Sequence, residues 1–189
     1  MTNNTKSYFN SVADNYTDSS SKGFWNLFRK NEKKAIIDLI RNKEYKNILE
    51  LGSGSGFYTE HLLKHTNNKV TCVDFSEEML NKIDLKNVIK INSNIEDFSH
   101  DTNYDLIFCA GALEFVHNIN KFFNNLEKLL SPDGVFITLV PHTNIFGLIY
   151  KIFHFSHNIK INLFTNKIIY DHTNLNGLRV IKIKKAFPF

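Results

Sequence analysis

The strongest constraint on the fold is an alternation of short apolar runs with helical patterns between residues 46 and 141. Helical patterns follow the first, second and fourth of these runs. Short, continuously apolar strands that alternate with helices are typical of a parallel sheet covered on both faces. Because crossovers between parallel strands are right-handed, the sequence predicts an α/β, doubly wound fold. The predicted strands are residues 46–51, 69–75, 87–92, 104–110 and 135–141, and the predicted helices between them are residues 58–64, 76–83 and 120–130.

The segments on either side of this alternation are less regular. Apolar residues at three- and four-residue intervals make residues 5–44 helical in pattern, either as one amphipathic helix or as a broken pair. After residue 141 we expect a helix near residues 164–176 and a last strand at 178–187. Since no repeat or proline-rich linker interrupts the 189 residues, we expect one domain.

The composition argues against several classes of protein. The net charge is +4 and the lysines are scattered, which favours a solvated surface over a nucleic-acid-binding stripe. Cys72 and Cys109 both lie inside predicted strands, so we expect no disulfide and a reducing cytoplasm. The N-terminus lacks the apolar core of a signal peptide, and no uninterrupted apolar run reaches the ~18 residues of a membrane helix. No spacing of His, Cys or carboxylates predicts a metal site.

Three of the eight glycines, Gly52, Gly54 and Gly56, directly follow the first predicted strand. Glycine tolerates a positive φ and lets another group approach the backbone, but it contributes no packing. In doubly wound sheets, ligands bind beyond the carboxyl ends of the strands. The loop therefore predicts a ligand site, and a plain strand-to-helix turn is the alternative.

The glycines do not fit a dinucleotide-binding fingerprint. That motif requires G-x-G-x-x-G. Counted from Gly52, the third glycine is replaced by Phe57, and counted from Gly54 it is replaced by Thr59. A nicotinamide oxidoreductase is therefore disfavoured.

Two acids near the loop indicate an adenosine ligand with a cationic group. Asp74 ends the second strand, 22 residues after Gly52, where a carboxylate can accept hydrogen bonds from ribose hydroxyls. Alternatively, Asp74 is an ordinary acid at a helix N-terminus beside Ser76. Glu50 precedes the loop, where it would repel a pyrophosphate and attract an ammonium group.

Together these segments resemble a known family. They occur in the order and spacing of the class I S-adenosylmethionine-dependent methyltransferases, and the resemblance covers about residues 45–141. It is strongest to the small-molecule branch, which includes quinone-biosynthesis and porphyrin-ester methyltransferases. The segments are "ILELGSGSGFYTEHLL", "VTCVDFSEEML", "INSNIEDF", "YDLIFCAGALEFV" and "LLSPDGVFITLVP".

The resemblance implies a Rossmann-like sheet, S-adenosylmethionine as cofactor and S-adenosylhomocysteine as product. Asn94 stands where the family often has Asp, and its carbonyl can still accept a hydrogen bond. Phe75 and Met79 could instead belong to the core, and Asn94 could be a plain loop residue. The implied cofactor-binding residues are Glu50, Gly52, Ser53 and Gly54 for the methionine end, Asp74 for the ribose, Phe75, Met79, Asn94 and Ile95 for the adenine, and Ala110, Gly111 and Leu113 for the backbone that faces the sulfonium.

The resemblance also divides the chain into a helical lid (residues 1–44), the cofactor-binding core (45–141) and an acceptor-side region with the last strand (142–189). Methylating a hydroxyl or an ammonium group requires a base that removes a proton. His142, at the end of the fifth strand, is our main candidate for this catalytic residue, and Glu114 and His117 are the others. Tyr8 and Tyr16 are candidates to lie over the site.

The acceptor is expected to be small and organic, with no nucleic acid as partner. The Pro-Pro-aromatic motif of base-amine methyltransferases is replaced by "CAGALEF", and neither cysteine follows a proline as in cytosine C5 enzymes. The apolar segment 145–164 favours an aromatic or lipophilic acceptor. The alternatives are a helix packed on the sheet and a helix on a membrane surface beside Lys151 and Lys160. Stable membrane insertion is not expected, and an oligomer is compatible with the sequence.

We therefore predict methyl transfer to an oxygen or nitrogen, with a non-catalytic cofactor-binding or scaffold module as the alternative. The family sheet usually ends in an antiparallel hairpin. Residues 178–187 match its first strand, and we expect the second to be missing. The edge would then be exposed or covered by a partner.

Overall fold

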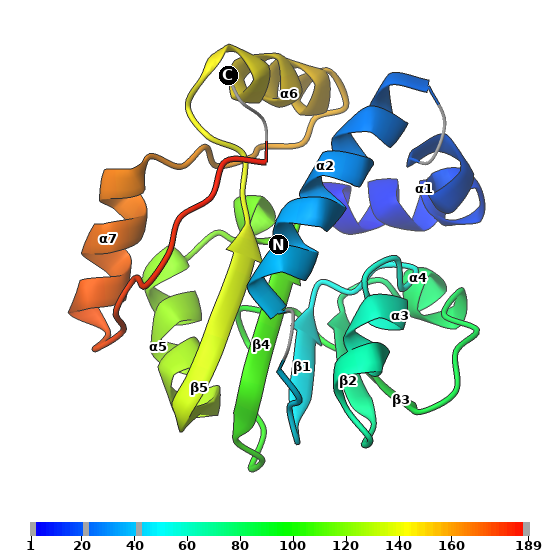
Figure 1. Cartoon of the computed structure of the whole chain (residues 1–189). Coiled ribbons are helices and arrows are strands. Elements are labelled where there is room, and N and C mark those ends of the chain that lie inside the picture. The colour runs from blue at the N-terminus through cyan, green and yellow to red at the C-terminus, as the bar shows by residue number, and fades with distance from the viewer. Residues whose placement is uncertain (1–2, 21–22, 41–42, 187–189) are drawn as a thin grey trace.

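The structure is a computed structural model that describes residues 3–20, 23–40 and 43–186, without the side chains of residues 3 and 14–29. Five parallel strands form one sheet in the order β3-β2-β1-β4-β5 (Figure 1). This order reverses beside β1, which confirms the predicted doubly wound topology. The strands are β1 (Ile48–Leu51), β2 (Val70–Asp74), β3 (Val88–Asn92), β4 (Tyr104–Ala110) and β5 (Leu130–Leu139).

Helices cover both faces of the sheet, and two further helices precede it (Figure 1). The N-terminal segment forms two helices, so the broken pair was the right alternative. Ser76 is an N-cap as its residue type predicts, because its hydroxyl accepts a hydrogen bond from the Met79 amide at 3.1 Å. The helices are α1 (Asn3–Ser20), α2 (Gly23–Ile40), α3 (Thr59–Leu62), α4 (Glu77–Asn81), α5 (Ile119–Leu129), α6 (Ile145–Ser156) and α7 (Asn166–Leu175), with 3₁₀ turns η1 (Leu63–His65) and η2 (Leu113–Phe115).

Each face of the sheet has its own core, as the pleat of the strands requires. In β1, Leu49 and Leu51 pack toward α5, whose Phe122 and Phe123 are buried. The neighbouring Ile48 belongs to the opposite core, which α2, α3 and α4 cover. A third, smaller cluster joins α1, η2 and the segment around Ile159.

The parallel register aligns the strand ends that carry the candidate site. Leu51 lies opposite Val73, one residue before the end of β2. Glu50 lies opposite Phe108 of β4. The loops after β1, β2 and β4 therefore leave the same edge of the sheet.

Two expectations for the C-terminal half differ from the structure. The fifth strand, expected at residues 135–141, spans Leu130–Leu139, and its register with β4 shifts across the "SPDG" segment. Residues 178–186 form no strand. A single strand added at the edge of the sheet would be hydrogen-bonded on one side only. The segment makes a side-chain contact with α2 instead, in which Lys184 forms an ion pair of 2.9 Å with Asp38. None of the described helices is long and apolar enough to cross a membrane.

Candidate functional site

The glycine loop folds back onto β2. The amides of Gly52 and Ser53 donate to the carbonyl of Val73 at 2.7 and 3.1 Å. Gly52, Gly54 and Gly56 all have positive φ, at 73°, 52° and 87°. This left-handed conformation explains why the loop contains glycine at all three positions.

The surroundings of the three glycines differ. A Cβ at Gly52 would lie 2.2 Å from Cβ of Ala112, and one at Gly56 would crowd Ile83 at 3.1 Å. A Cβ at Gly54 would meet none of the described atoms within 4 Å. Packing therefore accounts for two of the glycines, and of the three only Gly54 has open space beside it among the described residues.

Asp74 holds the loop in this shape. Its carboxylate accepts hydrogen bonds from the amide of Gly54 at 2.8 Å and from the amide of Ser76 at 2.9 Å. Burial raises the pKa of Asp74, although the amides of Ser76 and Gly54 act in the opposite direction. Asp74 is thus the acid at the start of α4 that we considered as an alternative. A carboxylate has about four lone-pair sites, so both oxygens can still accept ribose hydroxyls.

Glu50 is a buried acid at the foot of the loop. It is 2% exposed, and Oγ1 of Thr59 donates to its Oε2 at 2.5 Å. Burial raises the pKa of Glu50 to about 8, the Thr59 hydrogen bond lowers it, and the charge of Asp74 raises it. A buried carboxyl with this pKa would gain from a cation placed beside it.

Ser53 offers a further unsatisfied group in the same loop. Its side chain is buried, and Oγ has no hydrogen-bond partner among the described residues. Buried hydroxyls normally have a partner. Together with the open space at Gly54 and the acid at Glu50, this orphaned oxygen fits a polar, cationic ligand such as the methionine end of S-adenosylmethionine.

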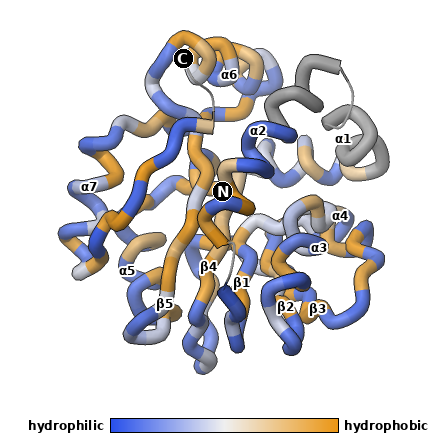
Figure 2. Tube along the Cα trace, in the orientation of Figure 1, coloured by the Kyte–Doolittle hydropathy of each residue, from blue (hydrophilic) through white to orange (hydrophobic). Residues whose placement is uncertain are grey.

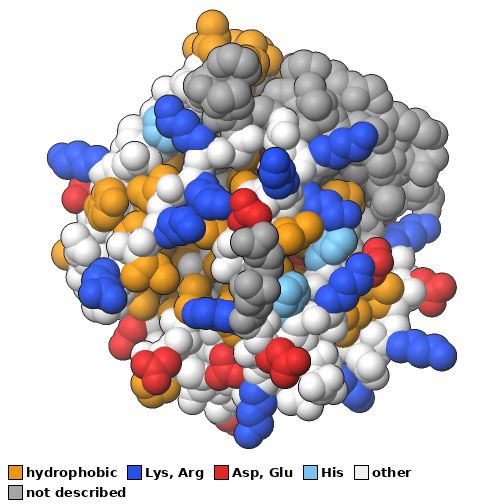
Figure 3. Space-filling model, in the orientation of Figure 1, with side chains coloured by type: hydrophobic (Ala, Val, Ile, Leu, Met, Phe, Trp, Pro, Cys, Tyr) orange, Lys and Arg blue, Asp and Glu red, His pale blue; other side chains and the backbone are white. Residues whose placement is uncertain are grey.

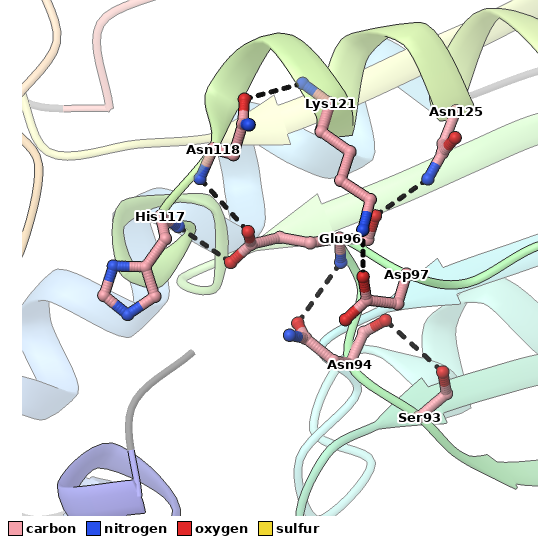
Figure 4. Close-up of polar contacts among 8 residues, drawn as sticks. All are labelled: Ser93, Asn94, Glu96, Asp97, His117, Asn118, Lys121 and Asn125. Atoms are coloured by element: carbon pink, nitrogen blue, oxygen red, sulfur yellow. Dashed lines mark hydrogen bonds and ion pairs between the residues drawn. The ribbon is translucent and has the colours of Figure 1, made fainter.

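The residues expected around the adenine have mixed environments. Phe75 is half-buried and its ring meets Phe9 of α1 edge-on, with centroids 5.9 Å apart. Met79 and Ile95 are both buried. The side-chain oxygen of Asn94 accepts from the Glu96 amide at 3.2 Å, so it already has a local partner (Figure 4).

Glu96 links the loops after β3 and β4 (Figure 4). Its carboxylate accepts from the amides of His117 at 2.7 Å and Asn118 at 3.1 Å. Burial raises the pKa of Glu96, the hydrogen bonds from these two amides lower it, and the net shift is downward. The side chain of Asn125 also donates to its carbonyl at 2.7 Å. The sequence analysis missed this residue, because its partners lie more than twenty positions away.

The loop after β4 lies against the glycine loop. Gly111 is exposed with φ of 68°, and Ala112 is the residue that occupies the space beside Gly52. Leu113 is fully buried in the core. Ala110 ends β4 and is half-buried.

The three candidate bases occupy different environments. His142 is exposed, and its backbone bridges to Phe164. His117 is also exposed and donates its amide to Glu96. Glu114 is buried, and its Oε1 accepts a hydrogen bond from the hydroxyl of Tyr150 at 3.4 Å.

Glu114 lies beside the loop expected to face the sulfonium. Its Oε1 is 4.0 Å from the position that a Cβ at Gly111 would occupy. The carboxylate is thus close to the same backbone as the cofactor candidates.

α1 packs against residues at this edge of the sheet. The ring of Phe9 meets Phe115 with centroids 5.3 Å apart, in addition to its contact with Phe75. The ring of Tyr8 meets His154 of α6 at 6.4 Å. The side chain of Tyr16 lies outside the described residues. No group of three or more His, Cys, Asp or Glu that could hold a metal occurs within the described part of the chain.

Comparison with known proteins agrees with this geometry. Residues 49–138 match the methyltransferase domain family Methyltransf_11. The chain is 31% identical over 102 residues to malonyl-[acyl-carrier protein] O-methyltransferase 2 of Ilyobacter polytropus, covering 51% of this chain and 39% of that protein. It is 32% identical over 96 residues to the ubiquinone biosynthesis O-methyltransferase of Rickettsia bellii, covering 48% and 40%.

The fold agrees as well. The solved DhpI–SAH complex superposes with a TM-score of 0.62 at 26% identity, covering 74% of this chain and 69% of that one. The chain spans about 40% of the length of the two curated relatives. Residues 49–138 thus match a methyltransferase domain model, and the chain is similar to S-adenosylmethionine-dependent methyltransferases in sequence and in fold.

Proposed function

We propose that this protein transfers a methyl group from S-adenosylmethionine to an oxygen or nitrogen of a small organic acceptor. The observation that carries the proposal is the open position at Gly54, whose amide is held by Asp74 and which lies in the loop after the buried Glu50. The two curated relatives are named as O-methyltransferases for malonyl-[acyl-carrier protein] and for ubiquinone biosynthesis. These names support a small-molecule acceptor.

When bound, S-adenosylmethionine supplies a methyl group on a positively charged sulfur and leaves as S-adenosylhomocysteine. Glu50 and the hydroxyl of Ser53 would bind its methionine end, and Asp74 would bind the ribose. The enzyme's further task is to align the acceptor and to exclude water. Phe9 and Phe115, which pack edge-on over this end of the sheet, supply an apolar cover.

Glu114 is the base that the geometry favours, with His142 as the alternative. Glu114 is buried beside Gly111, whereas His142 is exposed. The carboxylate would take the proton of the acceptor as its oxygen or nitrogen attacks the methyl group. In assays with labelled S-adenosylmethionine and a panel of phenol, carboxylate and amine acceptors, Glu114→Gln should lower kcat by at least ~100-fold for an acceptor that must lose a proton, and should have little effect for a carboxylate, which has none to lose. His142→Gln should leave kcat unchanged, and the reverse pattern would reassign the role.

Asp74 offers a sharp test of cofactor binding, because the fold contains a matched control. Asp105 also accepts two backbone amides, from Lys46 at 2.8 Å and Asn47 at 3.0 Å, but it does so at the opposite edge of the sheet. Asp74→Asn should weaken S-adenosylhomocysteine binding roughly 10- to 100-fold in isothermal titration.

Asp105→Asn should lower the free energy of unfolding about as much as Asp74→Asn does, and it should leave the affinity for S-adenosylhomocysteine unchanged. Equal affinities for both variants would contradict the role of Asp74. A wild-type protein that binds no S-adenosylmethionine at millimolar concentration would contradict the proposed function. Binding without transfer to any acceptor of the panel would favour the non-catalytic module.

The buried, free cysteines Cys72 and Cys109 suit a reducing compartment, and we place the protein in the cytoplasm on that basis.

A further inference from the structure

α6 presents its apolar side chains outward. Seven large apolar residues of this one helix are exposed, by between 39% and 69%. Figure 2 colours much of the α6 trace, at the top of the molecule, as hydrophobic, and Figure 3 shows hydrophobic side chains at the top of the same view. A soluble surface helix normally places its apolar stripe toward the core. The seven residues, here called the α6 ridge, are Ile145, Phe146, Leu148, Ile149, Ile152, Phe153 and Phe155.

The inward face of α6 is small and polar, and its contacts fix which face points outward. Gly147 lies so close to the chain before the helix that a Cβ would meet the carbonyl oxygen of His142 at 1.8 Å. His154 is buried, and its ring packs against Tyr150 with centroids 4.4 Å apart and against Phe115 at 5.4 Å. A rotation of the helix that buried the ridge would break all of these contacts.

The charged residues of the segment that carries the ridge have one sign. From Gly134 to Tyr170 the sequence contains no Asp or Glu. It contains Lys151, Lys160 and Lys167, and all three are exposed. An exposed apolar ridge with lysines and without acids is complementary to an anionic lipid surface, which attracts each nearby lysine by about 1 kcal/mol.

We propose that α6 lies in the interface of an anionic lipid bilayer and anchors this protein to the membrane surface. The helix has 12 residues, too few to cross the ~30 Å hydrocarbon core. A second copy of the chain fits less well, because a two-fold contact between ridges would bring Lys151 of both copies together. Segment 134–170 offers no acid to offset that repulsion.

The anchor lies at the edge of the sheet that carries the candidate site. α6 begins six residues after the end of β5, and its His154 packs on Phe115 in the loop after β4. A bilayer bound to the ridge would therefore lie on the acceptor side. The anchor itself does not depend on the proposed methyl transfer.

The test is co-sedimentation of the full chain with vesicles of phosphatidylcholine that contain 30% phosphatidylglycerol, in parallel with vesicles of phosphatidylcholine alone. We expect binding to the anionic vesicles, weakened several-fold when NaCl rises from about 50 to 500 mM. The double variant Ile149→Asn/Ile152→Asn should lower the partition coefficient at least tenfold, because two apolar side chains no longer enter the interface.

Leu175→Asn is the matched control, since Leu175 is an apolar residue of α7 that is 78% exposed and lies outside the ridge. It should bind vesicles like the unmodified protein. No binding to anionic vesicles, or equal loss in the control, would overturn the proposal. A dimer in sedimentation velocity that the ridge variant dissociates, together with no vesicle binding, would identify a second copy as the occupant and would also overturn it.

Discussion

Gly52, Gly54 and Gly56 share a left-handed backbone conformation, but the atoms around them differ. Gly52 is required by the approach of Ala112, and Gly56 by Ile83. Gly54 has no such neighbour among the described residues, so the ligand hypothesis for the loop rests on this position. Substitution by alanine separates these cases, because the added methyl group is the same and only its surroundings change.

We expect Gly54→Ala to weaken S-adenosylhomocysteine binding at least tenfold and to cost about 1–2 kcal/mol of stability through its φ of 52°. Gly177→Ala is the matched control: Gly177 has φ of 67° and open space, but follows α7. It should show similar strain with unchanged affinity. Gly52→Ala adds the clash with Ala112 and should cost about 2–4 kcal/mol. Titration calorimetry and urea unfolding measure both quantities, and equal affinity losses at Gly54 and Gly177 would refute the assignment.

From the raised pKa of Glu50 we predict that cofactor binding releases protons. Its pKa of about 8 in the folded chain exceeds the ordinary value of 4.5, so between these pH values the folded state holds a proton that the unfolded state has lost. Stability of the ligand-free protein should therefore fall as pH rises through this window, by at most ~1.4 kcal/mol per unit. A bound cation favours the carboxylate and lowers the pKa.

Binding at pH 7 should thus release up to one proton, and affinity should rise with pH to about 8. Calorimetry in phosphate and in Tris, whose ionisation enthalpies differ, counts the protons. Glu50→Gln should bind more weakly and release none. Proton release that persists in Glu50→Gln would assign it to another group.

At the scale of elements, Glu96 acts as a clamp between the loops after β3 and β4. Its folded pKa is lowered, so it contributes stability above its ordinary pKa that is lost as pH falls through the folded value. Glu96→Gln should cost roughly 1–3 kcal/mol near pH 7, since one of the amides of His117 and Asn118 loses its charged acceptor.

Denaturation at pH 7 and at a series of pH values below 4.5 measures the effect, and the difference between the two proteins should shrink as pH falls through that series. Glu127→Gln, at an exposed position of α5, is the control and should change stability by less than ~0.5 kcal/mol. A constant difference at all of these pH values would mean that the charge of Glu96 is irrelevant.

The elements of the sheet were predictable because each strand carries its own signal. The apolar runs predicted all five strands, and Ser76 predicted its helix start, since both depend on neighbours in sequence. Contacts between distant residues were not predictable in this way. The hydrogen bond of Thr59 to Glu50 and the packing of Phe9 on Phe75 depend on the folded arrangement.

The dependence on distant contacts also explains why the strand predicted at residues 178–187 was wrong. Residues 178–186 have an alternation suited to a strand, but alternation does not specify a pairing partner. α6 has the composition of a core helix, and only the contacts of Gly147 and His154 show that its apolar face turns outward.

At the scale of the whole molecule, the protein consists of a sheet with two cores and a small cap above its carboxyl edge. The cap joins α1, η2 and α6 through the rings of Tyr8, Phe115 and Tyr150, which all meet His154. This small cluster buries few residues, so we expect it to open more readily than the sheet.

His154 makes this opening depend on pH. Burial, together with a smaller effect of the charge of His157, lowers the pKa of His154 to about 4. The unfolded state therefore takes up a proton between pH 6.5 and 4 that the folded cap excludes, so the cap loses stability as pH falls through that window. Tyr150 packs against the His154 ring and donates a hydrogen bond to Glu114. Neither residue offsets the effect of burial on the pKa of His154.

Hydrogen exchange, corrected for intrinsic rates, should show faster opening of α1 and α6 at pH 5 than at pH 7, while β1 and β4 change little. In this pH range the protonation of Glu50 stabilises the folded chain as pH falls, which is opposite to the effect of His154. A global unfolding curve would therefore mask the effect of His154, and a local measurement is required. His154→Phe keeps the aromatic contacts without the titration and should make exchange in α6 independent of pH. If α6 and β4 responded equally, or if His154→Phe kept the pH dependence, the cap would not be a separate unit that His154 governs.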